Sequence, residues 1–365
     1  MDVFGAPKLK KLFKKDAVCH DNNLFKLHHQ ANYFFVFIGV LFIFGQNYLG
    51  NPIKCYKERD GYVEQYCWYH GSAHLPETLS KQVSGCIADQ RLFGYEDEGR
   101  QKDHEGDQRH TQYYLWLPFT LGLCLAIIKT PRFFWKNLCE RGLMESIMDN
   151  TLEKIAQKIA ELKGNRSFIY FLSFIFCEIL NILSIIFCTL TLDTLLEGNF
   201  LGYGSRVHEF YSTSEYDRRS FAMTNPMCDV FPTEVSCLIT SAGINGELEH
   251  KNHLCMLSNN MFNQYYFFVL WVWWIILFSL SLVFLILRVL QLFVPGVAAA
   301  TLRSQLSSYG LEARGEQLAE LKLKQWDYFL LMQIIRNLRK GSKVRELIKE
   351  MITLNRKIND RLELN

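Results

Sequence analysis

The chain lacks the short motifs that build most enzyme active sites. It has no phosphate-binding glycine loop, no His-Glu-x-x-His helix, no Gly-x-Ser-x-Gly elbow and no closely spaced cysteine pair of the zinc-binding type. Its ten histidines are scattered along the sequence and do not indicate a metal centre. We therefore expect a protein that is not an enzyme and that needs no cofactor.

Charged residues are missing from three long stretches and nearly missing from a fourth. No Asp, Glu, Lys or Arg occurs within 27–53, 110–128 or 252–287, and the stretch 167–192 holds only Glu178. A helix needs roughly 20 apolar residues to cross about 30 Å of hydrocarbon. The sequence therefore predicts four membrane-spanning helices, at residues 31–48, 112–129, 167–191 and 265–290.

The segments outside these spans differ in charge. Net charges are +3 for residues 1–30, +3 for 129–166 and +6 for 288–365, but −3 for 48–112 and −5 for 191–263. Because cytoplasmic segments are enriched in Lys and Arg, both termini are predicted to be cytoplasmic. The net charge of +3 for the whole chain hides this split and gives no reason to expect nucleic-acid binding.

Cysteines support the same topology. Three fall in each of the two loops predicted to face outward, where disulfides form and persist; they are Cys55, Cys67, Cys86, Cys228, Cys237 and Cys255. The basic first thirty residues lack the apolar core and cleavage site of a removable signal peptide. A multi-pass membrane protein with two disulfide-stapled loops is the prediction.

Helical periodicity appears in the cytoplasmic segments as well. Apolar residues recur at helical spacing in two groups: Ile147, Leu152, Ile155, Ile159 and Leu162, then Leu318, Leu321, Leu330, Ile334, Ile335 and Leu338. They predict amphipathic helices that pack into a cytoplasmic dome, with recruitment of a partner as the alternative. The predicted fold is an all-α four-helix membrane bundle with an N-terminal segment 1–30, extracellular loops 49–111 and 192–264, a cytoplasmic loop 130–166 and a cytoplasmic region 291–365.

A set of motifs in a fixed order resembles one family. The motifs include Asn51-Pro52-Ile53-Lys54-Cys55, Tyr66-Cys67-Trp68, Tyr113-Tyr114-Leu115-Trp116, Pro131-Arg132-Phe133-Phe134-Trp135-Lys136, Cys177-Glu178, Val230-Phe231-Pro232 and Leu270-Trp271-Val272-Trp273-Trp274. Over residues 1–340 the chain resembles the innexins, the subunits of invertebrate gap junctions. It departs from that pattern at Leu115, where the family usually has glutamine, and in carrying the extra cysteines Cys86 and Cys228.

The resemblance implies a large-pore channel in the plasma membrane. Innexins form rings, with eight subunits expected, and a ring docks with a second ring in the apposed cell to pass ions and small metabolites. Other innexins are possible partners in a mixed ring. Two alternatives stay open: a hemichannel that never docks and releases ions or ATP, and a four-span adhesion protein without a pore.

The resemblance also implies two disulfides, and order along the loops agrees with it. Cys55 lies close to the first span and Cys255 close to the fourth, so both are tethered near the membrane and should pair. Cys67 then pairs with Cys237. The third pairing, of Cys86 with Cys228, depends only on order and even number, and free thiols or glutathionylated cysteines are its alternatives.

Inside the channel, the resemblance places the first residues in the pore. Asp2, Val3 and Phe4 would line its mouth, and a ring of Asp2 carboxylates could favour cations. The alternative is an amphipathic helix that lies on the inner leaflet of the bilayer.

Three residues within the predicted spans are structural or gating candidates. Glu178 is a carboxylate deep in a span, which needs a partner, either Asn181 or a group on a neighbouring helix; direct contact with the pore is the alternative. Pro118 removes a backbone donor and can kink the second span, as a hinge or as a packing adaptation.

Overall fold

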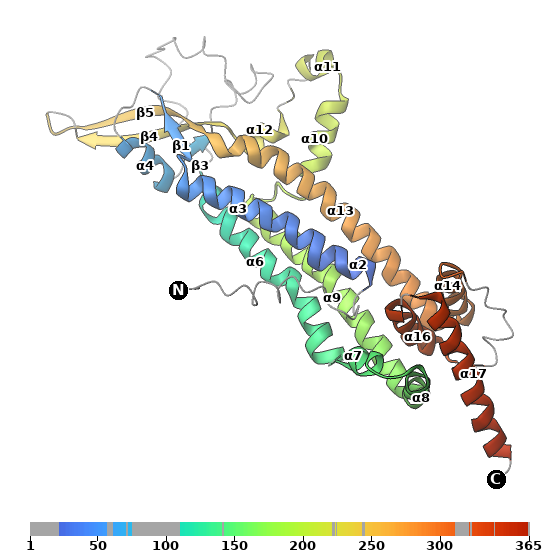
Figure 1. Ribbon diagram of the computed structural model, residues 1–365. Helices are drawn as coiled ribbons and strands as arrows, with labels where there is room; N and C mark the ends of the chain where they lie inside the picture. Colours follow the sequence, from blue (N-terminus) through green and yellow to red (C-terminus); the bar gives the residue numbers. More distant parts are fainter. Residues whose placement is uncertain are drawn as a thin grey trace, which may run out of the picture. The chain divides into compact units, whose positions relative to one another are not determined.

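The computed structural model describes residues 22–56, 61–70, 72–74, 110–140, 142–220, 223, 225–242, 245–310, 321, 323–338 and 340–363. The chain divides into two compact units. One combines residues 1–29, 129–182 and 279–365, and the other combines 30–128 and 183–278. Figure 1 traces the four long helices, and residues of each belong to both units.

In the described part of the chain, four helices are long and apolar enough to cross a membrane, as the sequence predicted. The candidate spans, of 27, 25, 31 and 36 residues, are Asn23–Leu49, Tyr113–Asn137, Asn165–Leu195 and Ser258–Phe293. The helices within them are α2 (Asn23–Lys26), the π-helical η1 (Leu27–Asn32), α3 (Tyr33–Leu49), α6 (Tyr113–Phe134), α9 (Asn165–Leu195) and α13 (Ser258–Phe293), and α6 continues into the π-helical η3 (Trp135–Glu140). The spans are longer than the predicted stretches because polar residues at their ends continue the helical hydrogen bonding.

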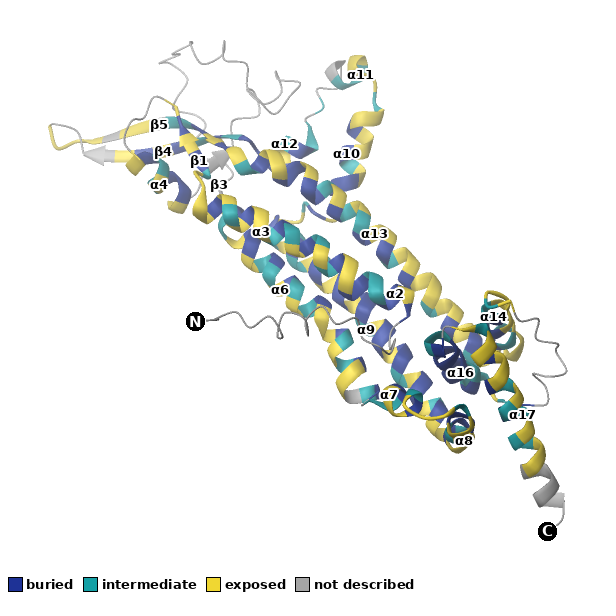
Figure 2. Ribbon diagram, in the orientation of Figure 1, coloured by how far each residue is buried: buried dark blue, intermediate teal, exposed yellow. Residues whose placement is uncertain are grey.

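The long helices expose many large apolar side chains. Figure 2 shows exposed residues along each of them. Phe42, Phe119, Leu183 and Val283 are examples of exposed apolar side chains on the four helices. Contiguous apolar surface of this kind is rare on a soluble monomer and marks contact with lipid or with other subunits. The helices are therefore membrane spans whose outer faces need an apolar environment.

In one unit, the loop between the first two spans and the loop between the last two form a small antiparallel sheet that the sequence patterns did not indicate. The strand order is β1 (Ile53–Cys55), β5 (Leu248–Leu257), β4 (Glu234–Ala242), β2 (Ser72–His74) and β3 (His110–Thr111). Hairpin β4–β5 pairs in register from Glu234 opposite Met256 to Ala242 opposite Leu248. Short helices of the same unit are α4 (Gly61–His70), α10 (Tyr203–Ser212), α11 (Glu215–Ser220) and α12 (Pro226–Val230).

The other unit buries its apolar residues among short helices. These are α7 (Leu143–Met148), α8 (Leu152–Leu162), α14 (Pro295–Ser307), α16 (Gln325–Leu338) and α17 (Gly341–Glu363). Ile155 and Ile159 of α8 are buried, and so are Ile334 and Ile335 of α16. The helices predicted from apolar spacing are thus confirmed for α7, α8 and the part of the second group that lies in α16, whereas Leu321 lies in a turn before α16 and Leu318 lies outside the described residues.

Helix α6 continues through Pro118. Proline lacks the N–H that would bond to the carbonyl four residues earlier, which belongs to Tyr114. The side chain of Asn47 on α3 donates to this carbonyl instead, at 2.9 Å. A neighbouring helix therefore satisfies the acceptor that the proline leaves open, as membrane helices require.

Helices α3 and α13 approach closely at a glycine. A Cβ on Gly39 would overlap the ring and hydroxyl of Tyr266.

We expect Gly39→Ala to lower the free energy of unfolding by about 1–3 kcal/mol, because overpacking forces side chains and backbone to shift. Thermal unfolding of the detergent-solubilised protein measures the effect. Gly45→Ala on the same helix is the control, since nothing lies near its added Cβ; equal melting temperatures for the two variants would contradict the close approach.

Candidate functional site: the disulfide-linked loops and the buried polar contacts of the bundle

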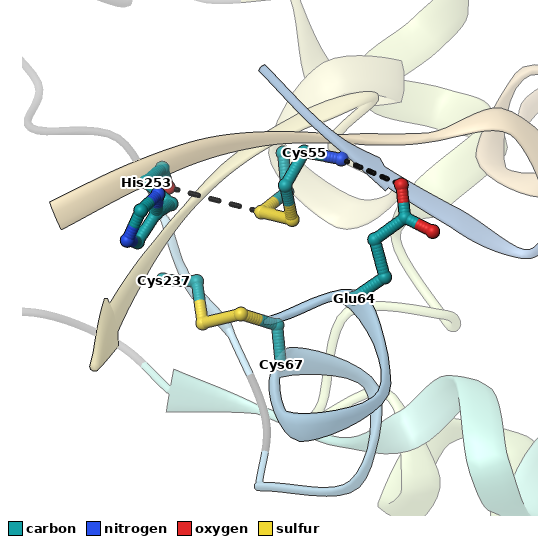
Figure 3. Close-up of a disulfide and its surroundings, with 6 residues drawn as sticks. Cys55, Glu64, Cys67, Cys237 and His253 are labelled. Atoms are coloured by element: carbon teal, nitrogen blue, oxygen red, sulfur yellow. Dashed lines mark hydrogen bonds between the residues drawn. A yellow bond between two sulfur atoms is a disulfide. The ribbon is translucent and has the colours of Figure 1, made fainter. Parts of the chain in front are cut away.

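Two disulfides join the loop after the first span to the loop before the fourth. Cys55 of β1 is bonded to Cys255 of β5, its register partner in the sheet. Cys67 of α4 is bonded to Cys237 of β4. Both bonds join the pairs expected from the sequence, and they place the two loops on the same side of the membrane. Figure 3 shows the two bridges next to each other.

The Cys67–Cys237 bridge and one hydrogen bond fix α4 against the sheet. The side chain of Glu64 on α4 accepts a hydrogen bond from the Cys55 backbone N–H at 3.4 Å (Figure 3). The sulfur atoms of Cys55, Cys67 and Cys255 lie within 4.8 Å of one another, but sulfurs in disulfides lack the thiolate that binds a metal. The bonds close loops with sequence separations of 200 and 170 residues, and each disulfide is worth about 2–5 kcal/mol. The cluster is therefore structural.

A third bridge stays a prediction. Cys228 in α12 takes part in a disulfide, whereas Cys86 lies outside the described residues. The pairing of Cys86 with Cys228 is therefore neither supported nor contradicted.

Amide side chains at the start of α13 hold the segment that leads into β4. Asn260 donates to the Pro232 carbonyl at 2.6 Å and to the Tyr113 hydroxyl at 2.8 Å. Gln264 donates to the Phe231 carbonyl at 2.8 Å, and Tyr203 donates to the Gln264 carbonyl at 2.9 Å. All of these side chains are buried, and burial raises the pKa of the Tyr203 hydroxyl, which keeps it a donor. This network fixes the sheet to the bundle.

These amides were not among the residues predicted from the sequence. The pattern was present in the sequence: Asn260, Asn263 and Gln264 stand at spacings of three and four, on one face of a mostly apolar helix. Polar residues on one stripe of a membrane helix indicate contact with protein rather than lipid.

Glu178, deep in α9, finds its partner on a neighbouring helix. The Arg288 guanidinium of α13 lies 3.4 Å from its carboxylate, and both side chains are buried. Among the residues that the structure describes, the other carboxylate oxygen has no hydrogen-bond partner. Asn181, the other partner considered for Glu178, is buried one turn along α9. The carboxylate bonds to Arg288 instead. Arg288 was counted with the basic residues of the cytoplasmic region 288–365, so it was not predicted as the partner of Glu178.

Arg288 also connects the spans to two short helices. It donates to Gln291 at 3.0 Å, and Gln291 donates to Thr301 of α14 at 3.2 Å. Its guanidinium lies over the rings of Phe174 on α9, at 5.5 Å, and Phe329 on α16, at 4.8 Å. One buried cation therefore links α9 and α13 to α14 and α16.

The predicted pore residues Asp2, Val3 and Phe4 lie outside the described residues. Asn22, where the described chain begins, caps α2 by accepting from the Asn23 backbone N–H at 2.8 Å. It also accepts from Arg336 of α16 at 3.4 Å. Asn22, directly before the first span, is thus bonded to α16.

The fold and the site define a four-span membrane protein whose two loops on one side are joined by disulfides. A protein-family model described as innexin matches residues 21–354. The chain is 31% identical over 350 residues to Innexin inx2 of Drosophila melanogaster, covering 92% of this chain and 91% of that protein. It is 26% identical to Innexin inx2 of Schistocerca americana, with coverages of 92% and 93%, and 25% identical to Innexin shaking-B of Drosophila melanogaster, with coverages of 93% and 91%.

The chain belongs to the innexin family, as the sequence motifs indicated. Innexins form the gap junction channels of invertebrates, and they are channel proteins rather than enzymes. The four spans and the disulfide-linked loops are the parts of such a channel subunit.

Proposed function

We propose that eight copies of this chain form a ring in the plasma membrane that docks with a second ring in the apposed cell. The paired rings pass ions and small metabolites, and other innexins can join the same ring. The disulfide-locked sheet carries this proposal: docking two rings requires loops of fixed shape, and two bridges with hairpin β4–β5 supply one. The exposed apolar side chains of the four helices support assembly within a bilayer.

Charge supports the orientation in which the sheet is extracellular and both termini are cytoplasmic. The two disulfide-linked loops are net acidic, whereas the segments at the opposite ends of the spans are net basic. Disulfides are also stable outside the cell and rare in the reducing cytoplasm.

An epitope test checks this orientation. A tag placed after Asn365 should bind antibody only in permeabilised cells, and a tag inserted beside Glu98 should bind antibody on intact cells. The reverse labelling pattern would contradict the proposed topology.

For the pore, we propose that Asp2, Val3 and Phe4 line its mouth. The attachment of Asn22 to the spans and to α16 supports this, because it holds the end of the N-terminal segment at the bundle. In the ring, eight Asp2 carboxylates would attract cations.

We expect Asp2→Asn to lower the preference for cations over anions, since it removes that ring of charge. The shift in reversal potential under a salt gradient measures the effect. Asp16→Asn is the control, because it removes an equal charge farther along the same segment. Equal reversal potentials for wild type and Asp2→Asn would place the N-terminus outside the permeation path and favour a helix on the membrane surface.

A further inference from the structure

Four cysteines among the described residues carry free thiols, and they fall into two pairs. Cys124 of α6 contacts Cys188 of α9, where the Cys188 thiol also donates to the Cys124 carbonyl at 4.0 Å. Cys139 of η3 packs against the buried apolar cluster that contains Cys177 of α9, and the two thiols interact. Both pairs connect α6 or its continuation to α9. Cys177 and Cys188 are eleven residues apart, about three helical turns, so they share one face of that helix.

The pairs differ in burial within the subunit. Cys124 and Cys188 lie inside candidate spans and are fully buried. Cys139 lies in the last turn of η3, the continuation of α6, and its side chain is partly exposed. Cys177 beneath it is fully buried in the apolar core around Trp135 and Phe174. A polar oxidant can therefore reach Cys139 first, and it can reach Cys177 only through Cys139.

We infer that Cys139 and Cys177 are a modification site at which a peroxide forms a reversible disulfide between η3 and α9. This inference concerns the single subunit and holds whether or not rings dock. Cys139 lies in η3, and the chain continues through Gly142, at a positive φ, into α7; Figure 1 shows α6 and α7. A covalent bond here would fix the end of α6 to α9.

One molecule of hydrogen peroxide supplies the oxidant needed to form this disulfide from two thiols. The Cys139 thiolate attacks a peroxide oxygen, the O–O bond breaks, and the leaving hydroxide takes a proton to become water, which leaves a sulfenic acid on Cys139. The Cys177 sulfur then attacks the Cys139 sulfur, and the S–O bond breaks as hydroxide leaves with the Cys177 proton as a second water. Two thiols lose two electrons, and hydrogen peroxide becomes two waters.

The test treats the full-length oligomer in lipid nanodiscs with hydrogen peroxide, blocks remaining thiols with N-ethylmaleimide, and identifies peptides under non-reducing conditions. We expect a peptide that links Cys139 to Cys177, loss of label at both positions, and recovery of both labels after brief treatment with a dithiol. Cys124 and Cys188 should keep their label after denaturation, which makes them an internal control.

Two variants sharpen the result. Cys139→Ser, at a partly exposed position, should leave the oligomer intact and Cys177 labelled after peroxide. Cys124→Ser should form the linked peptide as the wild type does. The inference is overturned if Cys139 reaches the sulfinic or sulfonic acid while Cys177 stays free, if Cys139 links to another cysteine such as Cys19, or if peroxide leaves both thiols unchanged.

Discussion

Replacing Cys55 with serine is expected to abolish electrical coupling between paired cells. The substitution removes the bond that joins β1 to β5 and leaves the Cys255 thiol free to pair wrongly with the neighbouring Cys67–Cys237 bridge, whose Cys67 sulfur lies within 4.8 Å of the Cys255 sulfur. Loss of one such bridge costs about 2–5 kcal/mol, which is large against the stability of a typical domain. Cys237→Ser should have the same effect. Dual voltage clamp of cell pairs measures it, with surface labelling to show that the protein reaches the membrane.

A free cysteine elsewhere in the chain provides the control. Cys139→Ser changes a residue outside the disulfide cluster and should leave coupling at the wild-type level in untreated cells. The double variant Cys55→Ser/Cys255→Ser separates loss of the bond from mispairing, because it leaves no free thiol at this site. Wild-type coupling in that double variant would contradict a need for the bridge.

The second large effect is expected at the buried ion pair of Glu178 and Arg288. Removing one partner of such a pair leaves an uncompensated buried charge and costs about 3–5 kcal/mol. We expect Arg288→Met and Glu178→Gln each to reduce the yield of assembled oligomer, with Arg288→Met the more severe. Arg288→Met also removes the hydrogen bond to Gln291 and the contacts with Phe174 and Phe329, which Glu178→Gln keeps. Size-exclusion chromatography and thermal unfolding measure both variants.

A double-mutant cycle tests whether the two residues act together. The double variant Glu178→Gln/Arg288→Met has no unpaired buried charge, so its loss should be smaller than the sum of the two single losses. Glu161→Gln, an exposed carboxylate on α8, is the control and should unfold like the wild type. Strictly additive losses would show that the pair contributes no coupling energy.

The spans could be predicted from the sequence because lipid excludes charge. A helix in hydrocarbon satisfies its own backbone groups, so a long stretch without charged residues is sufficient to indicate it. Glu178 interrupts one stretch without ending the helix, since Arg288 compensates it. The partner itself could not be found in the sequence, because a basic residue at the end of an apolar stretch has the same appearance whether it faces water or a buried carboxylate.

The sheet shows a different limit. Val235, Cys237 and Ile239 are buried along β4 and alternate with residues that point outward, so the period of two was present in the sequence. The alternation was not recognised because β4 lies among charged and polar residues in a loop between spans. Pairing of β1 with β5 could not be predicted because it depends on contacts about 200 residues apart in the sequence. The motifs identified the family without revealing that pairing of strands.

Dual whole-cell recording from paired cells that lack other channels of this family, each expressing the chain, tests the central claim most directly. We predict junctional current that flows between the two cells and is lost with Cys55→Ser in either cell. Current only across the membrane of single cells would identify a hemichannel instead, and adhesion of the cells without any current would identify a protein without a pore; either result would contradict an intercellular channel.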